Sequence, residues 1–143
     1  MRIEVPYDRR EDDRGTLIHV TNGQWRQVNV VYSKKGVLRG GHYHTSKEEF
    51  FFVVRGKVEV KVVDIREGPE APLATHLFST GEAFAMEPWE QHYMRFHEDT
   101  VLLVLYDQPF NPNDLDSPVD PRFAPLDQAF GAPDQAEDGT GSR

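Results

Sequence analysis

The chain of 143 residues contains no cysteine. Disulfide bonds, thiolate metal sites and cysteine nucleophiles are therefore excluded, and any metal ion must be held by histidine and carboxylate side chains. The absence of cysteine agrees with a reducing compartment. The charged N-terminal segment also lacks the apolar stretch of a signal peptide. Together these features predict a cytoplasmic protein.

Long apolar runs are also missing, and none approaches the roughly 20 residues that a membrane-spanning helix needs. Apolar residues do not recur at helical spacing over several turns, and there is no internal repeat. The net charge of −8 makes binding to the phosphates of nucleic acid unfavourable. Apolar residues still form 38% of the chain, which is enough for one folded domain.

Composition changes towards the C-terminus, where small, polar and acidic residues replace apolar ones. Such a segment cannot bury enough apolar surface to order itself. We expect residues 1–125 to form the folded domain and residues 126–143 to form a flexible acidic tail.

Several short segments have the patterns of β-strands. Residues 57–62 alternate valine with charged side chains, while residues 50–54 and 101–106 are continuous apolar runs, typical of strands buried on both faces. Residues 27–32 are also rich in strand-forming types. The Arg55-Gly56 step and residues 79–82 are predicted to be hairpin turns. Many short strands joined by glycine-bearing turns predict an all-β sandwich or closed barrel.

The segment at residues 36–56, GVLRGGHYHTSKEEFFFVVRG, carries the most informative pattern. His42 and His44 are two apart, so on a strand both imidazoles point to the same side. A hairpin after them would return Glu49 beside the pair, and His92 would add a fourth ligand from a distant strand. Three imidazoles and one carboxylate suit one divalent ion, and this ligand set does not discriminate among zinc, iron, manganese, nickel and cobalt. Such a set leaves coordination positions open for substrate.

The same segment matches the first motif of the cupin superfamily, G(X)5HXH(X)4E(X)6G, without a gap. The second motif, G(X)5PXG(X)2H, is matched at Gly81 and His92, but Glu87 and Trp89 stand where it has proline and glycine. The chain therefore resembles the cupins. This resemblance implies a single small barrel of the double-stranded β-helix or jelly-roll type.

Within the superfamily, residues 23–60 and 108–117 resemble the zinc-binding C-terminal cupin domain of CapF-type capsule-polysaccharide enzymes, in which the cupin epimerises a keto sugar nucleotide. The DDRG element at residues 12–15 is similar to one in dTDP-sugar 3,4-ketoisomerases, a more distant likeness. Those enzymes usually carry glutamine where this chain has Glu49. The resemblance thus implies polysaccharide biosynthesis, a sugar-nucleotide substrate and a metal-dependent branch with zinc as the expected metal.

These likenesses and the metal-ligand pattern predict an epimerase or isomerase that removes a proton α to a carbonyl. The metal would stabilise the enediolate oxygen, and other side chains must take and return the proton. Tyr32 and Tyr106 are the candidates, on the expectation that both point into the barrel. Arg39 is expected to bind a phosphate if a bulge in the following Gly-Gly step turns it towards the pocket. Trp89 is expected to stack on a sugar or base, although packing beneath its turn explains it equally well.

Two other functions remain open on these residues. The same ligand set binds iron in dioxygenase cupins, and the same pocket would serve a non-enzymatic cupin that only binds a small molecule. Cupin barrels commonly pair through their sheets, which implies a homodimer in which the segment before Asp12 is exchanged. The remaining histidines, His19, His76 and His97, are interpreted as structural or surface residues.

Overall fold

The computed structural model describes residues 1–111 and 118–123. In the described part the chain is built from β-strands and one short 3₁₀ helix, η1. Their order is β1 (Arg2–Glu4), β2 (Asp8–Asp12), β3 (Gly15–His19), β4 (Gln27–Ser33), β5 (Leu38–His42), β6 (Glu49–Arg55), β7 (Lys57–Asp64), η1 (Ile65–Glu67), β8 (Ala74–Ser79), β9 (Ala83–Met86), β10 (Glu90–Phe96) and β11 (Thr100–Tyr106).

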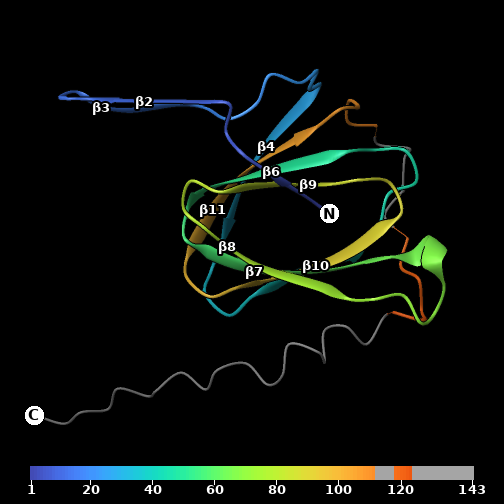
Figure 1. Ribbon diagram of the computed structural model, residues 1–143. Coiled ribbons are helices and arrows are strands. Elements are labelled where there is room, and N and C mark those ends of the chain that lie inside the picture. Colours follow the sequence, from blue (N-terminus) through green and yellow to red (C-terminus); the bar gives the residue numbers. More distant parts are fainter. Residues whose placement is uncertain (112–117, 124–143) are drawn as a thin grey trace, which may run out of the picture.

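Two antiparallel sheets face each other and form the barrel (Figure 1). One has the order β1-β9-β6-β11-β4 and the other β5-β10-β7-β8. From β4 onwards the chain crosses repeatedly between the sheets, so strands that follow one another usually belong to opposite layers. The all-β, jelly-roll prediction is confirmed.

The two predicted turns are present, but the prediction that they close hairpins is wrong. Each turn carries the chain from one sheet to the other. Gly56 joins β6 to β7, and residues 79–82 join β8 to β9, but neither pair of strands is hydrogen-bonded together. Gly56 has a φ of 109°, and a Cβ there would lie 2.3 Å from the hydroxyl oxygen of Thr100. A turn signal identifies the reversal of the chain, but it does not specify which strand becomes the neighbour.

Aromatic and aliphatic side chains from both sheets fill the barrel. Most of this core is fully buried: Phe51, Val53, Val58, Val60, Val62, Phe78, Phe84, Met86, Met94, Phe96, Leu102 and Val104. The outer faces of β6 and β11 are buried as well, because Ile18, Val20 and Trp25 pack over Phe50 and Leu105. This second layer explains why residues 50–54 and 101–106 are continuously apolar.

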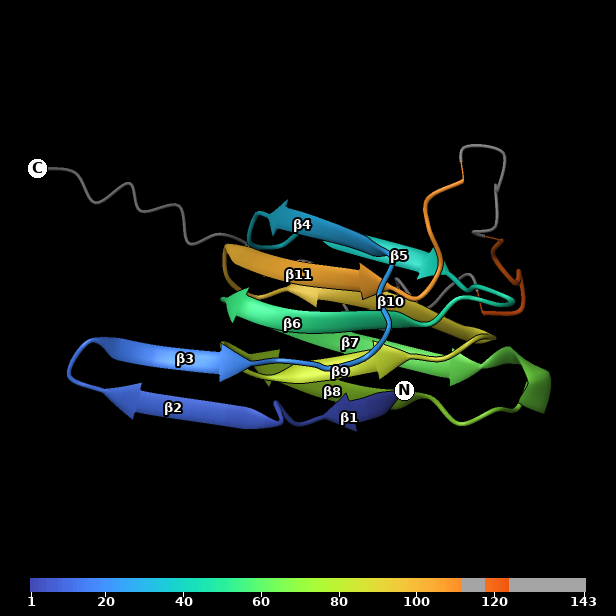
Figure 2. The ribbon, with the colours of Figure 1, turned by 90° about the horizontal axis from the view of Figure 1, so that it is seen from above.

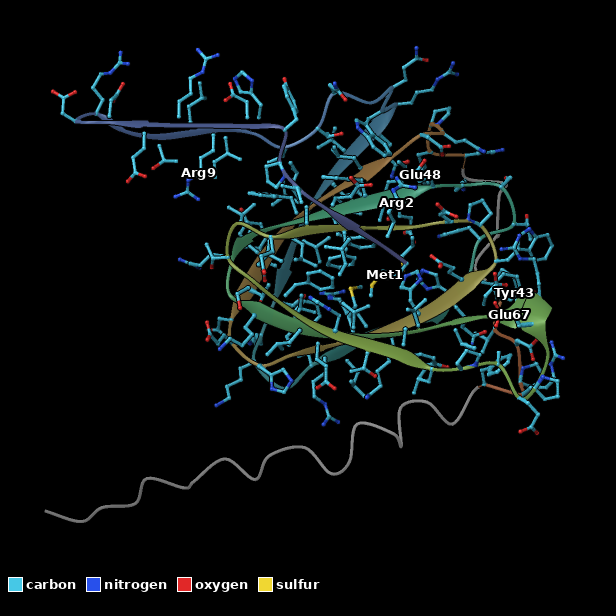
Figure 3. All side chains as sticks on the ribbon, in the orientation of Figure 1. Met1, Arg2, Arg9, Tyr43, Glu48 and Glu67 are labelled. Carbon is cyan, nitrogen blue, oxygen red and sulfur yellow. The ribbon has the colours of Figure 1, made fainter. Side chains whose placement is uncertain are left out.

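Strands β2 and β3 form a two-stranded sheet of their own. This hairpin extends beyond the barrel in both ribbon views (Figures 1 and 2). Arg9, on β2, lies well away from the barrel (Figure 3). A hairpin with no further strand beside it is marginally stable in water.

Residues 118–123 are held against the four-stranded sheet by hydrogen bonds to side chains of β10. Gln91 is fully buried and its side-chain oxygen accepts a hydrogen bond of 2.7 Å from the backbone of Asp120, while the Tyr93 hydroxyl donates to the carbonyl of Phe123 at 3.3 Å. The predicted acidic tail, residues 126–143, lies outside the described residues. In the described part, no helix is long and apolar enough to cross a membrane.

Candidate metal and substrate site

Strand pairing brings the predicted ligands together from three elements. His42 ends β5 and lies directly opposite His92 of β10 in the four-stranded sheet. Glu49 begins β6 in the facing sheet, so it approaches across the barrel and not from a hairpin neighbour. The ligand group therefore spans the two layers at one end of the barrel.

The ligand atoms of His42, Glu49 and His92 all lie within 4.8 Å of one another. His44 joins this group through Glu49, with 3.5 Å between its Nε2 and Oε1, and His92 Nε2 lies 3.4 Å from Oε2. Glu49 and His92 are almost completely buried, whereas His42 is half-buried. The predicted residues thus converge, with His42 on the accessible side.

A glycine pair aligns β5 with β10. The register shifts between His92 and Tyr93, where Gly41 is the extra residue, so the predicted bulge is present. Gly40 has a φ of 90°, and a Cβ there would lie 2.5 Å from the carbonyl oxygen of His92. Only glycine permits this close approach, which places His42 opposite His92.

Charges in the group suit cation binding. Burial, then repulsion by His92, lowers the pKa of His42 to about 4. Burial also lowers the pKa of His92. Burial opposes ionisation of Glu49, but the neighbouring imidazoles, His92 first, outweigh it and lower its pKa to about 2. Neutral imidazoles beside an ionised carboxylate are the forms that bind metal.

The His92 ring shows that these residues fit a metal ion. Its Nδ1 lies 3.1 Å from the carbonyl oxygen of Glu90, which fixes the proton on Nδ1 in the neutral ring. The lone pair of Nε2 then faces Glu49 Oε2, a buried oxygen without a hydrogen-bond partner among the described residues. Two facing lone pairs repel unless a cation lies between them.

The two candidate tyrosines have different positions. Tyr106 ends β11, where it pairs with Glu49 of β6 on one side and with Gln27 of β4 on the other. Burial and the charge of Glu49 raise the Tyr106 pKa. The expectation that Tyr32 points into the barrel is wrong. Its side chain is 72% exposed on the outer face of β4, where it shares a face with exposed valines.

Arg39 lies on the inner side of β5, because the bulge places it opposite the buried Met94. Its Nε donates to the buried Ser33 hydroxyl at 2.8 Å, and its Nη2 donates to the Tyr32 carbonyl at 3.2 Å. These bonds connect the edge strands β5 and β4 of the two sheets. The side chain remains exposed, so part of its guanidinium is available to a ligand.

Trp89 packs in a small cluster outside the main core. Its ring stacks on Tyr43 at 5.9 Å and lies against Val63, Ile65 and Phe123. Figure 3 places Tyr43 at one end of the barrel. This packing accounts for Trp89, and the prediction that it stacks on a substrate stays a prediction.

Sequence reasoning missed the polar inner face of β4. Gln27 and Asn29 face inward and are half-buried, while the apolar Val28, Val30 and Tyr32 face outward. The alternation was visible in the sequence. An apolar face of a strand usually points inward, but on this strand the inward face carries Gln27 and Asn29.

A family model for the polysaccharide biosynthesis C-terminal domain matches residues 10–117. The chain belongs to this family. A UDP-2-acetamido-2,6-beta-L-arabino-hexul-4-ose reductase of Pseudomonas aeruginosa is 27% identical over 66% of this chain and 26% of its own length. The spore coat polysaccharide biosynthesis protein SpsL of Bacillus subtilis is 26% identical over 84% of this chain and 78% of its own. The chain thus spans about a quarter of the first relative and most of the second.

Solved structures agree with this assignment. The capsular polysaccharide assembling protein CapF of Staphylococcus aureus is 25% identical, with a TM-score of 0.59 over 78% of this chain and 33% of CapF. QdtA, a sugar 3,4-ketoisomerase of Thermoanaerobacterium thermosaccharolyticum solved with TDP, shares the fold at a TM-score of 0.69 over 88% of this chain and 92% of its own, with 18% identity. The resemblance to cupin enzymes of sugar nucleotides is confirmed.

Proposed function

We propose that the protein is a metal-dependent epimerase or isomerase that moves a proton α to the carbonyl of a keto sugar nucleotide. The observation that carries this proposal is the convergence of His42, His44, Glu49 and His92 beside the Tyr106 hydroxyl at one end of the barrel. His42, Glu49 and His92 would hold the ion, with His44 completing the set. A bound divalent ion would act as a Lewis acid that stabilises an enediolate oxygen.

Proton transfer is assigned to Tyr106. When the α C–H bond breaks, its electron pair forms the enediolate and the proton passes to solvent water. Tyr106 then gives its hydroxyl proton to the carbon, and the released proton, or one from solvent, restores the phenol. The half-burial of the Tyr106 ring and its place directly beside Glu49 restrict where the hydroxyl can lie.

The substrate class is supported by Arg39 and by the relatives. A guanidinium held by Ser33 and the Tyr32 carbonyl at the junction of β4 and β5 is suited to bind a diphosphate. The Pseudomonas relative is named for a UDP-linked hexulose, and QdtA was solved with TDP. We therefore assign Arg39 to the nucleotide diphosphate of a 4-keto sugar.

Incubation with UDP- and dTDP-linked 4-keto sugars in deuterated water tests the proposal. We expect NMR to show deuterium at a carbon next to the carbonyl, and a chelator to stop the exchange until zinc is restored. Tyr106→Phe and His92→Ala should reduce the exchange at least about 100-fold, since each removes a group that acts in the transition state.

His97→Ala is the matched control. His97 pairs with Glu59 at 2.9 Å on the outer side of its sheet, so its loss should leave exchange unchanged. Binding of the nucleotide sugars without exchange would replace the proposal with a binding protein. Oxygen consumption by the iron-loaded protein with a substrate would replace it with a dioxygenase.

We also propose a homodimer. The β2–β3 hairpin pairs with no other strand in the described residues, and the exposed outer face of β4 is apolar. Both features are explained if a second copy of the chain covers them.

A further inference from the structure

His44 is the one member of the proposed metal group that does not lie on a strand. β5 ends at His42, which makes the last backbone pair of this strand with His92 of β10. Two residues further on, His44 is buried, and its Nε2 still lies 3.5 Å from Oε1 of Glu49. Hydrogen bonding between strands therefore does not hold His44 in place, and its position depends on other contacts.

Two backbone hydrogen bonds hold the chain at His44. The His44 carbonyl accepts from the amide of Trp89 at 2.6 Å, and the amide of Tyr43 donates to the carbonyl of Pro118 at 3.2 Å. The Trp89 amide belongs to the turn before β10, whereas Pro118 is the first of residues 118–123, a segment that we call the strap. The strap thus binds the backbone between two of the proposed ligands.

The only buried side chain of the strap is that of Phe123. It is 7% exposed, whereas the other five residues of the strap are exposed or half-buried. Its ring packs with Val63 and Ile65, and Tyr43 and Trp89 lie against the same apolar cluster. A buried aromatic ring contributes a large apolar area to the attachment of a segment. Removal of the ring would therefore release the strap, and with it the partner of the Tyr43 amide.

The strap also lies against β10, on the side of the strand that faces away from its ligand. Gln91 and Tyr93 flank His92, and side chains alternate across a strand. The Gln91 side-chain oxygen accepts from a backbone amide of the strap at 2.7 Å, and the Tyr93 hydroxyl donates to the Phe123 carbonyl at 3.3 Å. His92 is held independently, by pairing with β5 and β7. Loss of the strap should therefore leave His92 in place, unlike His44.

We propose that Phe123 is a positioning residue, which acts through the strap and Tyr43 to keep His44 within reach of the metal ion. The inference rests on the metal group of the proposed function and adds the residue that places its fourth ligand. Without the Phe123 ring the other three ligands would still form a site, because strands carry them. Residues that orient a ligand in this way contribute about 10- to 100-fold to metal affinity or activity.

Zinc affinity tests this proposal, by competition with a chromophoric chelator on the full chain stripped of metal. We expect Phe123→Ala to weaken zinc binding about 10- to 100-fold. Because Phe123 acts through His44, the double variant should bind zinc no more weakly than His44→Ala alone. The visible spectrum of bound cobalt should be similar in Phe123→Ala and His44→Ala and should differ from that of the wild type. Phe123→Leu, which keeps most of the buried apolar surface, should bind zinc nearly as the wild type does.

Tyr93→Phe is a milder variant, which removes only the hydroxyl that donates to the Phe123 carbonyl. We expect it to weaken zinc binding about two- to tenfold, which corresponds to the loss of one hydrogen bond. This variant is decisive if circular dichroism shows that Phe123→Ala is unfolded. Wild-type zinc affinity in Tyr93→Phe would then overturn the role of Phe123.

Phe110→Ala is the matched control, since it makes the same substitution at a position 74% exposed, between β11 and the strap in the sequence. It should bind zinc as the wild type does. Equal zinc affinity in wild type and folded Phe123→Ala, or additive losses in the double variant, would overturn the role of Phe123 alone. Failure of the wild type itself to bind zinc would instead remove the metal group, and both proposals with it.

Discussion

A single residue, Trp89, occupies the position where the second cupin motif has glycine. Its φ of 72° is the one positive value among the described non-glycine residues. The backbone at this point is held from both sides, since the Trp89 amide donates to His44 at 2.6 Å and its carbonyl accepts from Ile65 at 3.1 Å. The left-handed conformation therefore persists although a side chain is present, and packing on Tyr43 offsets its cost.

Replacing Trp89 with alanine and with glycine separates these two contributions. Both variants lose the ring, but only alanine retains the conformational cost of a positive φ, which is about 1–2 kcal/mol. Glycine also makes the unfolded chain more flexible, and this lowers the stability of the glycine variant. The stability difference between the two variants is therefore smaller than the conformational cost alone. We expect the free energy of unfolding in urea to be up to about 1 kcal/mol higher for Trp89→Gly than for Trp89→Ala. A more stable alanine variant would contradict this account.

Among the elements, β5 (Leu38–His42) depends on glycine both within the strand and in the turn before it. Gly36 and Gly40 both have positive φ values, of 84° and 90°, but of the two only Gly40 would bring an added Cβ against the backbone of β10. A Cβ at Gly36 would meet nothing within 4 Å, whereas one at Gly40 would lie 2.5 Å from the His92 carbonyl oxygen. An alanine at either position therefore has the conformational cost of a positive φ, but only an alanine at position 40 also clashes with β10.

We expect Gly36→Ala to lower the free energy of unfolding by about 1–2 kcal/mol, and Gly40→Ala to lower it by about 1–3 kcal/mol more. Because the clash displaces β5 from β10, Gly40→Ala should also reduce zinc occupancy, measured by elemental analysis of the folded protein. Equal unfolding free energies for the two variants would contradict this account, because they would mean that β5 can move away from β10 at no cost in stability.

Strand positions could be predicted from the sequence because local alternation and turn residues determine them. Strand partners could not, since the Gly56 turn looks the same whether it closes a hairpin or crosses to the other sheet. The convergence of His42, His44 and Glu49 could also be predicted, because their spacing in the sequence suggests one common site. The face of β4 was assigned wrongly, because Tyr32 shares its side with valines and only the tertiary structure shows that this side is the outer one.

At the scale of the whole molecule, the outer face of β4 is a candidate surface for pairing with a second copy of the chain. Val28, Val30 and Tyr32 are 60%, 53% and 72% exposed and lie together on one edge strand. We expect sedimentation velocity to show a dimer for the wild type and a monomer for Val30→Lys, because a buried lysine without a partner disfavours the interface. Val119→Lys, at a position 51% exposed outside this face, should remain dimeric. A monomeric wild type would contradict the proposal that a second copy of the chain covers the β2–β3 hairpin and this face of β4.

The crossing of the chain between sheets also determines when the ligand group can form during folding. β5 needs β10 as its neighbour, and β6 needs β9 and β11, all of which come much later in the sequence. Contacts between such distant segments form slowly. Zinc uptake should therefore coincide with the last step of refolding, and a chain still lacking β10 and β11, as during its synthesis, could not yet hold the ion.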